Sequence, residues 1–338
     1  MKKRLTELIT IDPSLTIPVY KQIVQSIYRN IDNGVLNQND ILPSVNSISE
    51  QFSLARGSVF TAYNDLRAAG IIDSIPGKGY FVTSTQTKQT KKIFLLFSTF
   101  TPYKETLYNA IINNLPKNCS VDIYFHHHSI KIFETLIREQ AAYYNTFIIM
   151  PELHSDTSSI LAKLDQKQTF LLDVGFKEFK KHYPGVYQNF DKDIYSILME
   201  SREFVAKYKR LFLVFPQGLR TRDIIAGFNK FSKTKTISSH IKVKIDSKEI
   251  KKGDAFIVIE DNDLVDVIKT AKANKWQPGK DIGVISYNET NLKSVIGDGI
   301  TTITTDFARM GKTIAEMIAS GKREIIENPF IMIDRQSF

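Results

Sequence analysis

The sequence predicts an α/β protein with a small, mainly helical N-terminal domain followed by a larger domain built on parallel β-sheets. Apolar residues recur every four positions over residues 19–31, as on one face of a helix. After residue 92, short runs that are apolar on both faces alternate with helix-length segments, which is typical of strands covered by helices. Between them, residues 80–92 (YFVTSTQTKQTKK) lack apolar periodicity. We therefore expect domains at 1–84 and 93–338, joined by a linker at 85–92.

The composition supports globular domains inside the cell. The chain has 338 residues, 42% of them hydrophobic, which is enough for two or three cores. A single cysteine, Cys119, excludes an intrachain disulfide framework. The start MKKRLTELIT lacks the apolar stretch of a secretory signal, and the run IFLLF is too short to cross a membrane. We expect a cytoplasmic protein without a membrane anchor.

The charge favours a polyanionic partner without locating it. The net charge is +9, and the first 92 residues hold 11 Lys and Arg against 7 Asp and Glu. This density of positive charge in about a quarter of the chain is consistent with binding to nucleic acid.

The N-terminal domain is expected to contain three helices and a hairpin, in that order. The first helix begins after Pro18 and ends before Gly34. The second covers residues 45–52, and the third runs from about 57 to 69, with a glycine stop at Gly70. Two short strands, at 71–72 and 80–82, are joined by the segment IPGKG.

The glycine-rich segment PGKGYFV (residues 76–82) has two possible meanings. A phosphate-binding loop of nucleotide enzymes has a longer spacing and leads into a helix. This segment leads into a β-run, which favours the tip of a hairpin wing. Gly77 and Gly79 permit the tight turn, and Lys78 is expected to project toward a DNA backbone or minor groove.

The second and third helices have the arrangement of a DNA-reading pair. A tight connection near Ser53 separates them, and Arg56, Gly57 and Ser58 begin the third helix. Such a helix fits the major groove, with its first turn toward base edges and its backbone N–H groups toward phosphate. Arg56 is the strong base reader, since its guanidinium can contact guanine O6 and N7 together.

Four ordered segments resemble the GntR-type winged helix-turn-helix. They are PVYKQIVQSIYRNIDNGVL, LPSVNSISEQF, LARGSVFTAYNDLRAAGII and PGKGYFV, and the resemblance covers residues 17–82 without gaps. We call this region the N-terminal head. The resemblance implies a DNA-binding transcription regulator in which Ser44 contacts phosphate, Arg56 a base, Gly57 and Ser58 the backbone, and Lys78 and Gly79 form the wing contact.

Two residues depart from that family. Asn46 and Phe60 stand where such regulators commonly have arginine. Asn46 is expected to contact adenine, with helix capping as its alternative. For Phe60, the alternative to a place on the DNA face is packing beneath the third helix.

The remainder of the chain resembles the LacI/GalR-type sensor, a relative of periplasmic sugar-binding proteins. The resemblance is carried by residues 280–322, from KDIGVISYNET to IASGK, and by upstream segments such as TFLLDVG and FIVIEDNDLVDVIKTAKANKW. It covers residues 91–322 and implies a two-lobed parallel-sheet α/β domain with a ligand cleft. A GntR-type reader joined to such a sensor is similar to arabinose-type repressors.

A sugar site needs carboxylates, amides and an arginine beside an aromatic ring. By motif position, five residues resemble the family's ligand-contacting positions: Tyr103, Asp173, Arg222, Asp261 and Asn288. Asn288 stands where aspartate is more usual. The alternatives are capping of the following helix for Asp173 and Asp261, and an interlobe ion pair for Arg222.

These observations favour a dimeric repressor whose operator binding responds to a monosaccharide or sugar phosphate. We expect no catalytic residues and no cofactor. We also expect no metal, because three consecutive histidines, His126–His128, cannot converge on one ion. The alternatives are a pyridoxal-phosphate enzyme fused to the same reader, which lacks a convincing Schiff-base lysine motif here, and a sugar carrier, which would need an export signal.

Overall fold

A computed structural model describes residues 8–86, 91–218 and 221–338. The chain divides into two compact units. The first comprises Met1–Leu96, Lys117–Ile148 and His154–Thr169, and the second comprises Phe97–Pro116, Ile149–Leu153 and Phe170–Phe338. Residues 87–90 of the expected linker lie outside the described residues. The boundaries at 84 and 93 stay predictions.

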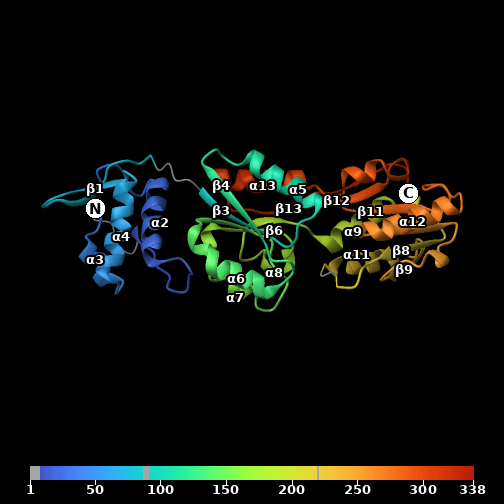
Figure 1. Ribbon diagram of the computed structural model, residues 1–338, viewed down its shortest axis with the longest axis horizontal. Coiled ribbons are helices and arrows are strands. Elements are labelled where there is room, and N and C mark those ends of the chain that lie inside the picture. The colour runs from blue at the N-terminus through green and yellow to red at the C-terminus, as the bar shows by residue number, and fades with distance from the viewer. Residues whose placement is uncertain (1–7, 87–90, 219–220) are drawn as a thin grey trace. The chain divides into compact units, whose positions relative to one another are not determined.

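The N-terminal head contains the three expected helices (Figure 1). They are α2 (Val19–Asp32), α3 (Val45–Gln51) and α4 (Arg56–Ala68). The four-residue repeat of α2 buries Ile23, Ile27 and Ile31 in one core with Val59 and Leu66 of α4. Burial of these apolar stripes fixes which face of α4 remains outward.

The glycine-rich segment forms the tip of a hairpin, as the sequence predicts. Strands β1 (Ile72–Ile75) and β2 (Gly79–Val82) pair in antiparallel register, Ile72 with Val82 and Ile75 with Gly79. Gly77 and Gly79 have φ of 79° and 88°, in the left-handed region that side chains with a Cβ rarely adopt. The turn therefore places Lys78 at the tip.

Helices and strands alternate through the rest of the chain (Figure 1). The strands are β3 (Lys91–Phe97), β4 (Cys119–Phe125), β5 (Thr146–Ile149), β6 (Thr169–Asp173), β7 (Gly185–Tyr187), β8 (Arg210–Val214), β9 (Ser238–Lys242), β10 (Asp254–Val258), β11 (Gly283–Tyr287), β12 (Thr301–Thr305), β13 (Ile325–Glu327) and β14 (Phe330–Ile333). The α-helices are α5 (Pro102–Asn114), α6 (Ile130–Gln140), α7 (Thr157–Leu161), α8 (Phe176–Phe179), α9 (Phe190–Glu200), α10 (Arg202–Val205), α11 (Asp223–Ser232), α12 (Asp261–Ala273) and α13 (Phe307–Ser320).

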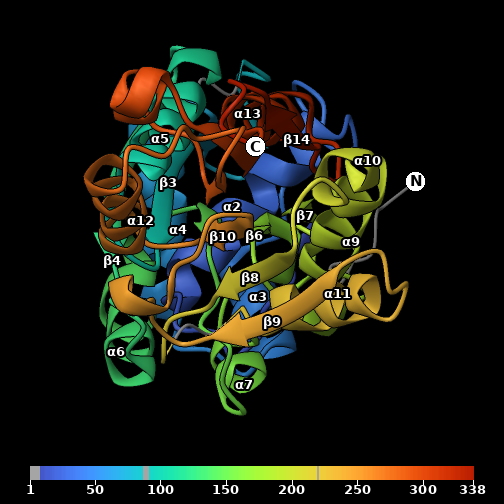
Figure 2. The same ribbon diagram turned by 90° about the vertical axis from the view of Figure 1, so that its right-hand side faces the viewer.

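The second unit contains a sheet of order β14-β12-β11-β10-β8-β9. Its pairs are parallel, except that β12 and β14 are antiparallel. Figure 2 shows β9 beside β8 in this sheet. The strands β13, β7 and β6 form a second parallel set in this unit, and β5, β3 and β4 follow one another in the first unit. The predicted parallel α/β architecture is confirmed. Polar residues at the carboxyl ends of β6 and β11 form part of the second of the two candidate sites described below.

Candidate functional site

Helix α4 presents one apolar face to the core and one polar face to solvent. Val59, Ala62, Tyr63 and Leu66 are buried. The opposite side, which we call the outward face of α4, consists of exposed residues: Arg56, Gly57, Phe60, Thr61 and Asn64. The N-cap residue is Ala55, whose side chain makes no capping hydrogen bond. Backbone N–H groups at this helix start are therefore not satisfied by a side-chain cap, as suits a phosphate contact.

Ser44 and Asn46 differ in what they contribute to α3. Ser44 is the N-cap, and its Oγ accepts a hydrogen bond of 3.1 Å from the Ser47 backbone N–H. Asn46 follows in the first turn with its side chain exposed, so capping is supplied by Ser44 instead. At the hairpin tip, Lys78 Nζ lies 5.5 Å from the centre of the Phe81 ring. The ammonium group is thus held at the wing by an aromatic contact.

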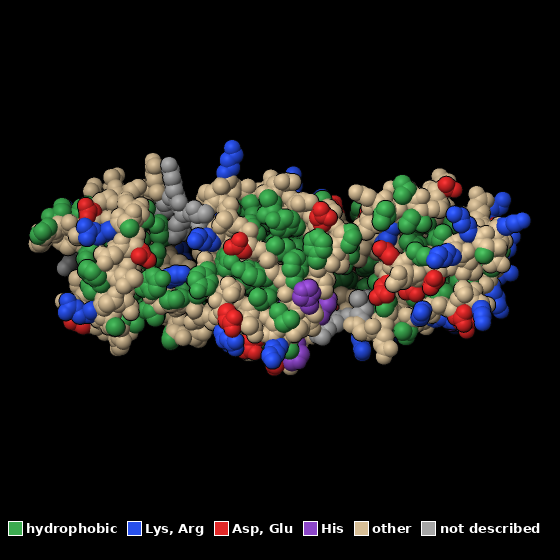
Figure 3. Space-filling model, viewed as in Figure 1, with side chains coloured by type: hydrophobic (Ala, Val, Ile, Leu, Met, Phe, Trp, Pro, Cys, Tyr) green, Lys and Arg blue, Asp and Glu red, His purple; other side chains and the backbone are tan. Residues whose placement is uncertain are grey.

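The positive charge does not single out one region. On the face shown in Figure 3, Lys and Arg side chains are spread along the chain and interspersed with Asp and Glu. The outward face of α4 and the wing, and not the net charge, therefore indicate where DNA is contacted.

A second constellation lies in the second unit, where four polar side chains are buried together. We call Lys104, Asp173, Gln188 and Tyr287 the buried polar cluster. Lys104 lies in the first turn of α5, Asp173 ends β6, Gln188 follows β7 and Tyr287 ends β11. Chain segments far apart in sequence therefore bring these groups to strand ends, where ligands of open α/β sheets bind.

The hydrogen bonds of this cluster are incomplete. Gln188 Nε2 donates to Asp173 Oδ1, and Lys104 Nζ donates to the hydroxyls of Ser98 and Thr99. Burial raises the pKa of Asp173 and lowers that of Lys104, although each charge partly offsets the effect on the other. Gln188 Oε1 and the Tyr287 hydroxyl have no hydrogen-bond partner among the described residues. Buried polar atoms without partners are costly, so these atoms mark a place where a ligand can bond.

An aromatic pair adjoins the cluster. The ring of Tyr103 stacks on Phe307 at 4.9 Å between centres and 27° between planes. Burial raises the pKa of Tyr103, and the carboxylates of Asp173 and Asp261 act in the same direction. Burial likewise raises the pKa of Tyr287 well above its ordinary value, with Asp173 and Tyr103 contributing. Tyr103, Asp173 and Asp261 are thus electrostatic neighbours.

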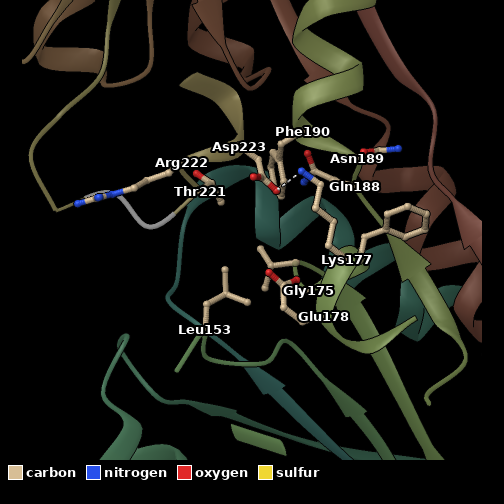
Figure 4. Close-up of a pocket in the computed structure, with 12 residues that line it drawn as sticks. Leu153, Gly175, Lys177, Glu178, Gln188, Asn189, Phe190, Thr221, Arg222 and Asp223 are labelled. Carbon is tan, nitrogen blue, oxygen red and sulfur yellow. Dashed lines mark ion pairs between the residues drawn. The ribbon is translucent and has the colours of Figure 1, made fainter. Parts of the chain in front are cut away.

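A solvent-open pocket of about 480 Å³ shares Gln188 with the cluster. Its lining includes Val174 and Gly175, directly after Asp173, together with Asn189 and Arg222. Figure 4 shows the Arg222 guanidinium directed away from Gln188. Lys177 crosses the pocket region, pairing with Asp223 at 3.1 Å and with Asp191 at 3.2 Å.

Asp261 and Asn288 are connected through a third residue, Lys293. The buried Lys293 Nζ pairs with Asp261 Oδ1 at 3.1 Å and donates to the Asn288 backbone carbonyl at 2.8 Å. The carboxylate of Asp261 is therefore tied to the segment after β11, while Glu260 is the N-cap residue of α12. Asp173 accepts a hydrogen bond from Gln188, and the N-cap residue of α8 is Gly175. Neither Asp173 nor Asp261 is therefore the N-cap residue of the helix that follows it.

Comparison with known proteins accounts for both parts of the chain. Residues 19–82 match the model of bacterial regulatory proteins of the gntR family, and residues 217–337 match that of a periplasmic binding protein-like domain. The chain is 30% identical over 106 residues to the HTH-type transcriptional repressor YtrA of Bacillus subtilis, covering 31% of this chain and 78% of YtrA. The chain belongs to the GntR family. This GntR-family protein is a DNA-binding transcription regulator with a sensor domain of the periplasmic binding protein type.

Other relatives resemble the GntR-family protein over shorter or more distant stretches. The arabinose metabolism transcriptional repressor of Geobacillus stearothermophilus is 31% identical over 91 residues, which are 26% of this chain and 25% of that repressor. The dimeric Lac repressor has a TM-score of 0.59 at 16% identity, covering 73% of this chain and 98% of that structure. The latter similarity establishes the fold of the sensor region.

Four buried residues of the GntR-family protein were not expected from the sequence: Lys104, Gln188, Tyr287 and Lys293. Two of them directly follow or precede predicted residues, since Lys104 is next to Tyr103 and Tyr287 is next to Asn288. For Lys104 and Tyr287, this adjacency is the signal by which the sequence could have indicated them. Within residues 8–86, 91–218 and 221–338, no three His, Cys, Asp or Glu side chains are grouped so as to hold a metal ion.

Proposed function

We propose that this GntR-family protein is a repressor whose operator affinity is controlled by a sugar or sugar-derived effector bound at the buried polar cluster. The observation that supports this most is the pair of unsatisfied buried polar atoms, Gln188 Oε1 and the Tyr287 hydroxyl, the second of which is an electrostatic neighbour of Tyr103. A sugar offers hydroxyl groups in fixed directions and apolar C–H faces. It therefore supplies both the missing hydrogen bonds and a surface for stacking.

The predicted effector residues have different parts in this proposal. Asp173 and Tyr103 contact the effector directly. Asp261 and Asn288, which Lys293 holds together, form the edge of the site. Arg222 turns toward the site when the effector is present. DNA binding is assigned to Arg56, Asn46 and Ser44, to Gly57 and Ser58 at the helix start, and to Lys78 and Gly79 in the wing. The relatives named as repressors of transcription and of arabinose metabolism support this assignment.

Control of DNA binding requires two states with different effector affinity. The GntR-family protein acts as a homodimer in which effector binding changes the geometry of two N-terminal heads. The solved structure of a dimeric Lac repressor, whose fold is similar, supports this arrangement. Because the effector favours one state, it changes operator affinity by the ratio of its affinities for the two states.

This regulator acts in the cytoplasm and has no catalytic activity of its own. Similar curated proteins are transcription regulators. The alternative of a pyridoxal-phosphate enzyme is tested by adding pyridoxal phosphate to the purified protein. A visible absorption band from a lysine Schiff base would favour the enzyme. Separately, none of the described helices is long and apolar enough to cross a membrane.

A thermal-shift screen against monosaccharides and their phosphate esters tests the effector class. Phosphate esters belong in the screen because a groove next to the pocket is lined by Lys177, Lys180, Lys192 and Lys230. A ligand present at 100 times its Kd stabilises the folded state by about 2.7 kcal/mol. A rise in melting temperature that is lost in Asp173→Asn would support the proposal. If no sugar or sugar phosphate stabilises the protein, the assignment of a sugar effector is wrong.

A further inference from the structure

Phe60 is an apolar residue on an otherwise polar surface. On the outward face of α4 it lies one helical turn after Arg56 and one turn before Asn64, since these residues are four apart. Its side chain is 51% exposed, among the large hydrophobic residues left outside the cores. The apolar residues of the N-terminal head that are buried or packed against its core do not include Phe60.

This exposure rules out packing beneath the third helix as the role of Phe60. The underside of α4 is filled by Val59, Ala62, Tyr63 and Leu66. Phe60 directly follows Val59 and is therefore turned by about 100° around the helix axis from it, which leaves Phe60 exposed while Val59 is buried. Because this exposed phenyl ring lies in a row with Arg56, it is available to a partner that offers apolar surface on the DNA side.

The major groove offers one such group. Each thymine exposes a C5-methyl group there, and apolar side chains including Phe contact it in specific complexes. One helical turn advances about 5.4 Å along the axis, which is between one and two base-pair steps of DNA. Phe60 is therefore placed to contact a base close to the one read by Arg56.

We propose that Phe60 is a specificity-determining residue that reads a thymine methyl group in the operator. The inference rests on the sequence-specific DNA binding proposed above. It gives the outward face of α4 a mixed code, in which Arg56 recognises a guanine and Phe60 a neighbouring thymine. Arginine at position 60 would instead favour a second guanine.

Replacement of thymine by deoxyuridine tests this proposal, because it removes only the methyl group. The full chain is first used to select operator duplexes from a random pool. Each thymine of the selected operator is then replaced in turn, and affinity is measured by fluorescence anisotropy. We expect the affinity of the wild-type protein to fall about fourfold when deoxyuridine replaces one or two particular thymines. This factor corresponds to the free energy of burying one methyl-sized group.

Substitutions at position 60 assign the effect to the ring. Phe60→Ala should bind the thymine and deoxyuridine operators equally, and Phe60→Leu should keep part of the discrimination. Phe204→Ala is the matched control, because Phe204 is 49% exposed in α10 of the second unit. It should retain the wild-type profile.

The outcomes separate this inference from the proposed function. If no sequence is selected from the pool, sequence-specific binding fails and the role of Phe60 fails with it. If an operator is selected but wild type and Phe60→Ala have the same deoxyuridine profile, the role of Phe60 alone is overturned. Circular dichroism melting of Phe60→Ala and Phe60→Leu confirms that both variants fold.

Discussion

The carboxyl group of Asp193 links burial to a measurable dependence on pH. Asp193 lies in α9 and accepts a hydrogen bond of 3.1 Å from the Asn189 backbone N–H. Burial raises the pKa of Asp193 to about 7, against the opposing effect of that hydrogen bond, and the negative charge of Glu327 adds to the rise. The folded state thus binds a proton between about pH 4 and 7 that the unfolded state releases.

Asp193 therefore stabilises the folded state at low pH, and this contribution is lost as pH rises through 7. A change of three pKa units corresponds to about 4 kcal/mol, which is an upper limit for this site. We expect Asp193→Asn to be more stable than wild type at pH 8 and to differ little at pH 4, near the pKa of an unfolded aspartate. Urea unfolding at both pH values measures this. Equal pH dependence in wild type and variant would contradict it, and exposed Glu200→Gln is the control.

Arg56 is the residue on which direct base readout depends most. Loss of a bidentate contact to guanine costs about 1–3 kcal/mol of discrimination. We expect Arg56→Ala to reduce the preference for operator over random DNA by about 5-fold to 150-fold, measured in a competition gel shift. Arg67→Ala removes a charge from the last turn of the same helix and should keep the preference. Unchanged selectivity in Arg56→Ala would reject this role.

At the same scale, the sequence indicates some site residues and conceals others. Asp173 directly follows an apolar strand, so a strand-end carboxylate could be predicted. Lys104 could not, because lysine is rarely buried and only the folded chain shows the hydroxyls of Ser98 and Thr99 around it. The exposure of Phe60 likewise required the orientation of α4, since its apolar character alone is compatible with packing.

Among the elements, strands with continuous apolar runs were predictable and polar or short ones were not. Seven apolar runs of the sequence correspond to observed strands. The runs are IFLLF, VDIYF, TFIIM, TFLLDV, RLFLVF, AFIVIE and IGVISY, and they form β3, β4, β5, β6, β8, β10 and β11, respectively. Strand β12 is fully buried but consists of TTITT, which has the composition of a polar segment. Strand β7 has three residues, too few for an alternating pattern. Both depend on sheet neighbours, a tertiary effect absent from local sequence.

The β1–β2 hairpin makes its own testable contribution through Lys78. One lysine at a phosphate contributes about one unit to the slope of log affinity against log salt. We expect Lys78→Ala to weaken binding to all DNA sequences and to flatten that slope by about one. Lys207→Ala is the matched control, because Lys207 also stacks on a ring, 4.2 Å from the centre of Phe204, outside the N-terminal head. An unchanged slope for Lys78→Ala would count against a wing contact.

For the whole molecule, regulation requires the effector site and the DNA site to be separable by mutation. The buried polar cluster lies in the second unit, and the outward face of α4 lies in the first. Coupling between ligand sites typically amounts to 1–3 kcal/mol, or about 5-fold to 150-fold in affinity. A substitution that removes effector binding alone should abolish the effect of the effector on DNA affinity. It should leave the DNA affinity of the unliganded protein unchanged.

Asp173→Asn is suited to this test, because asparagine has nearly the shape of aspartate and can still accept the hydrogen bond from Gln188. We expect it to bind the operator as wild type does, while the sugar found in the thermal-shift screen no longer changes that affinity. Anisotropy titrations with and without this sugar measure both quantities. Exposed Glu316→Gln in α13 controls for the loss of one negative charge. A full response in Asp173→Asn would remove this carboxylate from the effector site, whereas loss of operator binding without sugar would show that the cluster supports the DNA-binding state itself.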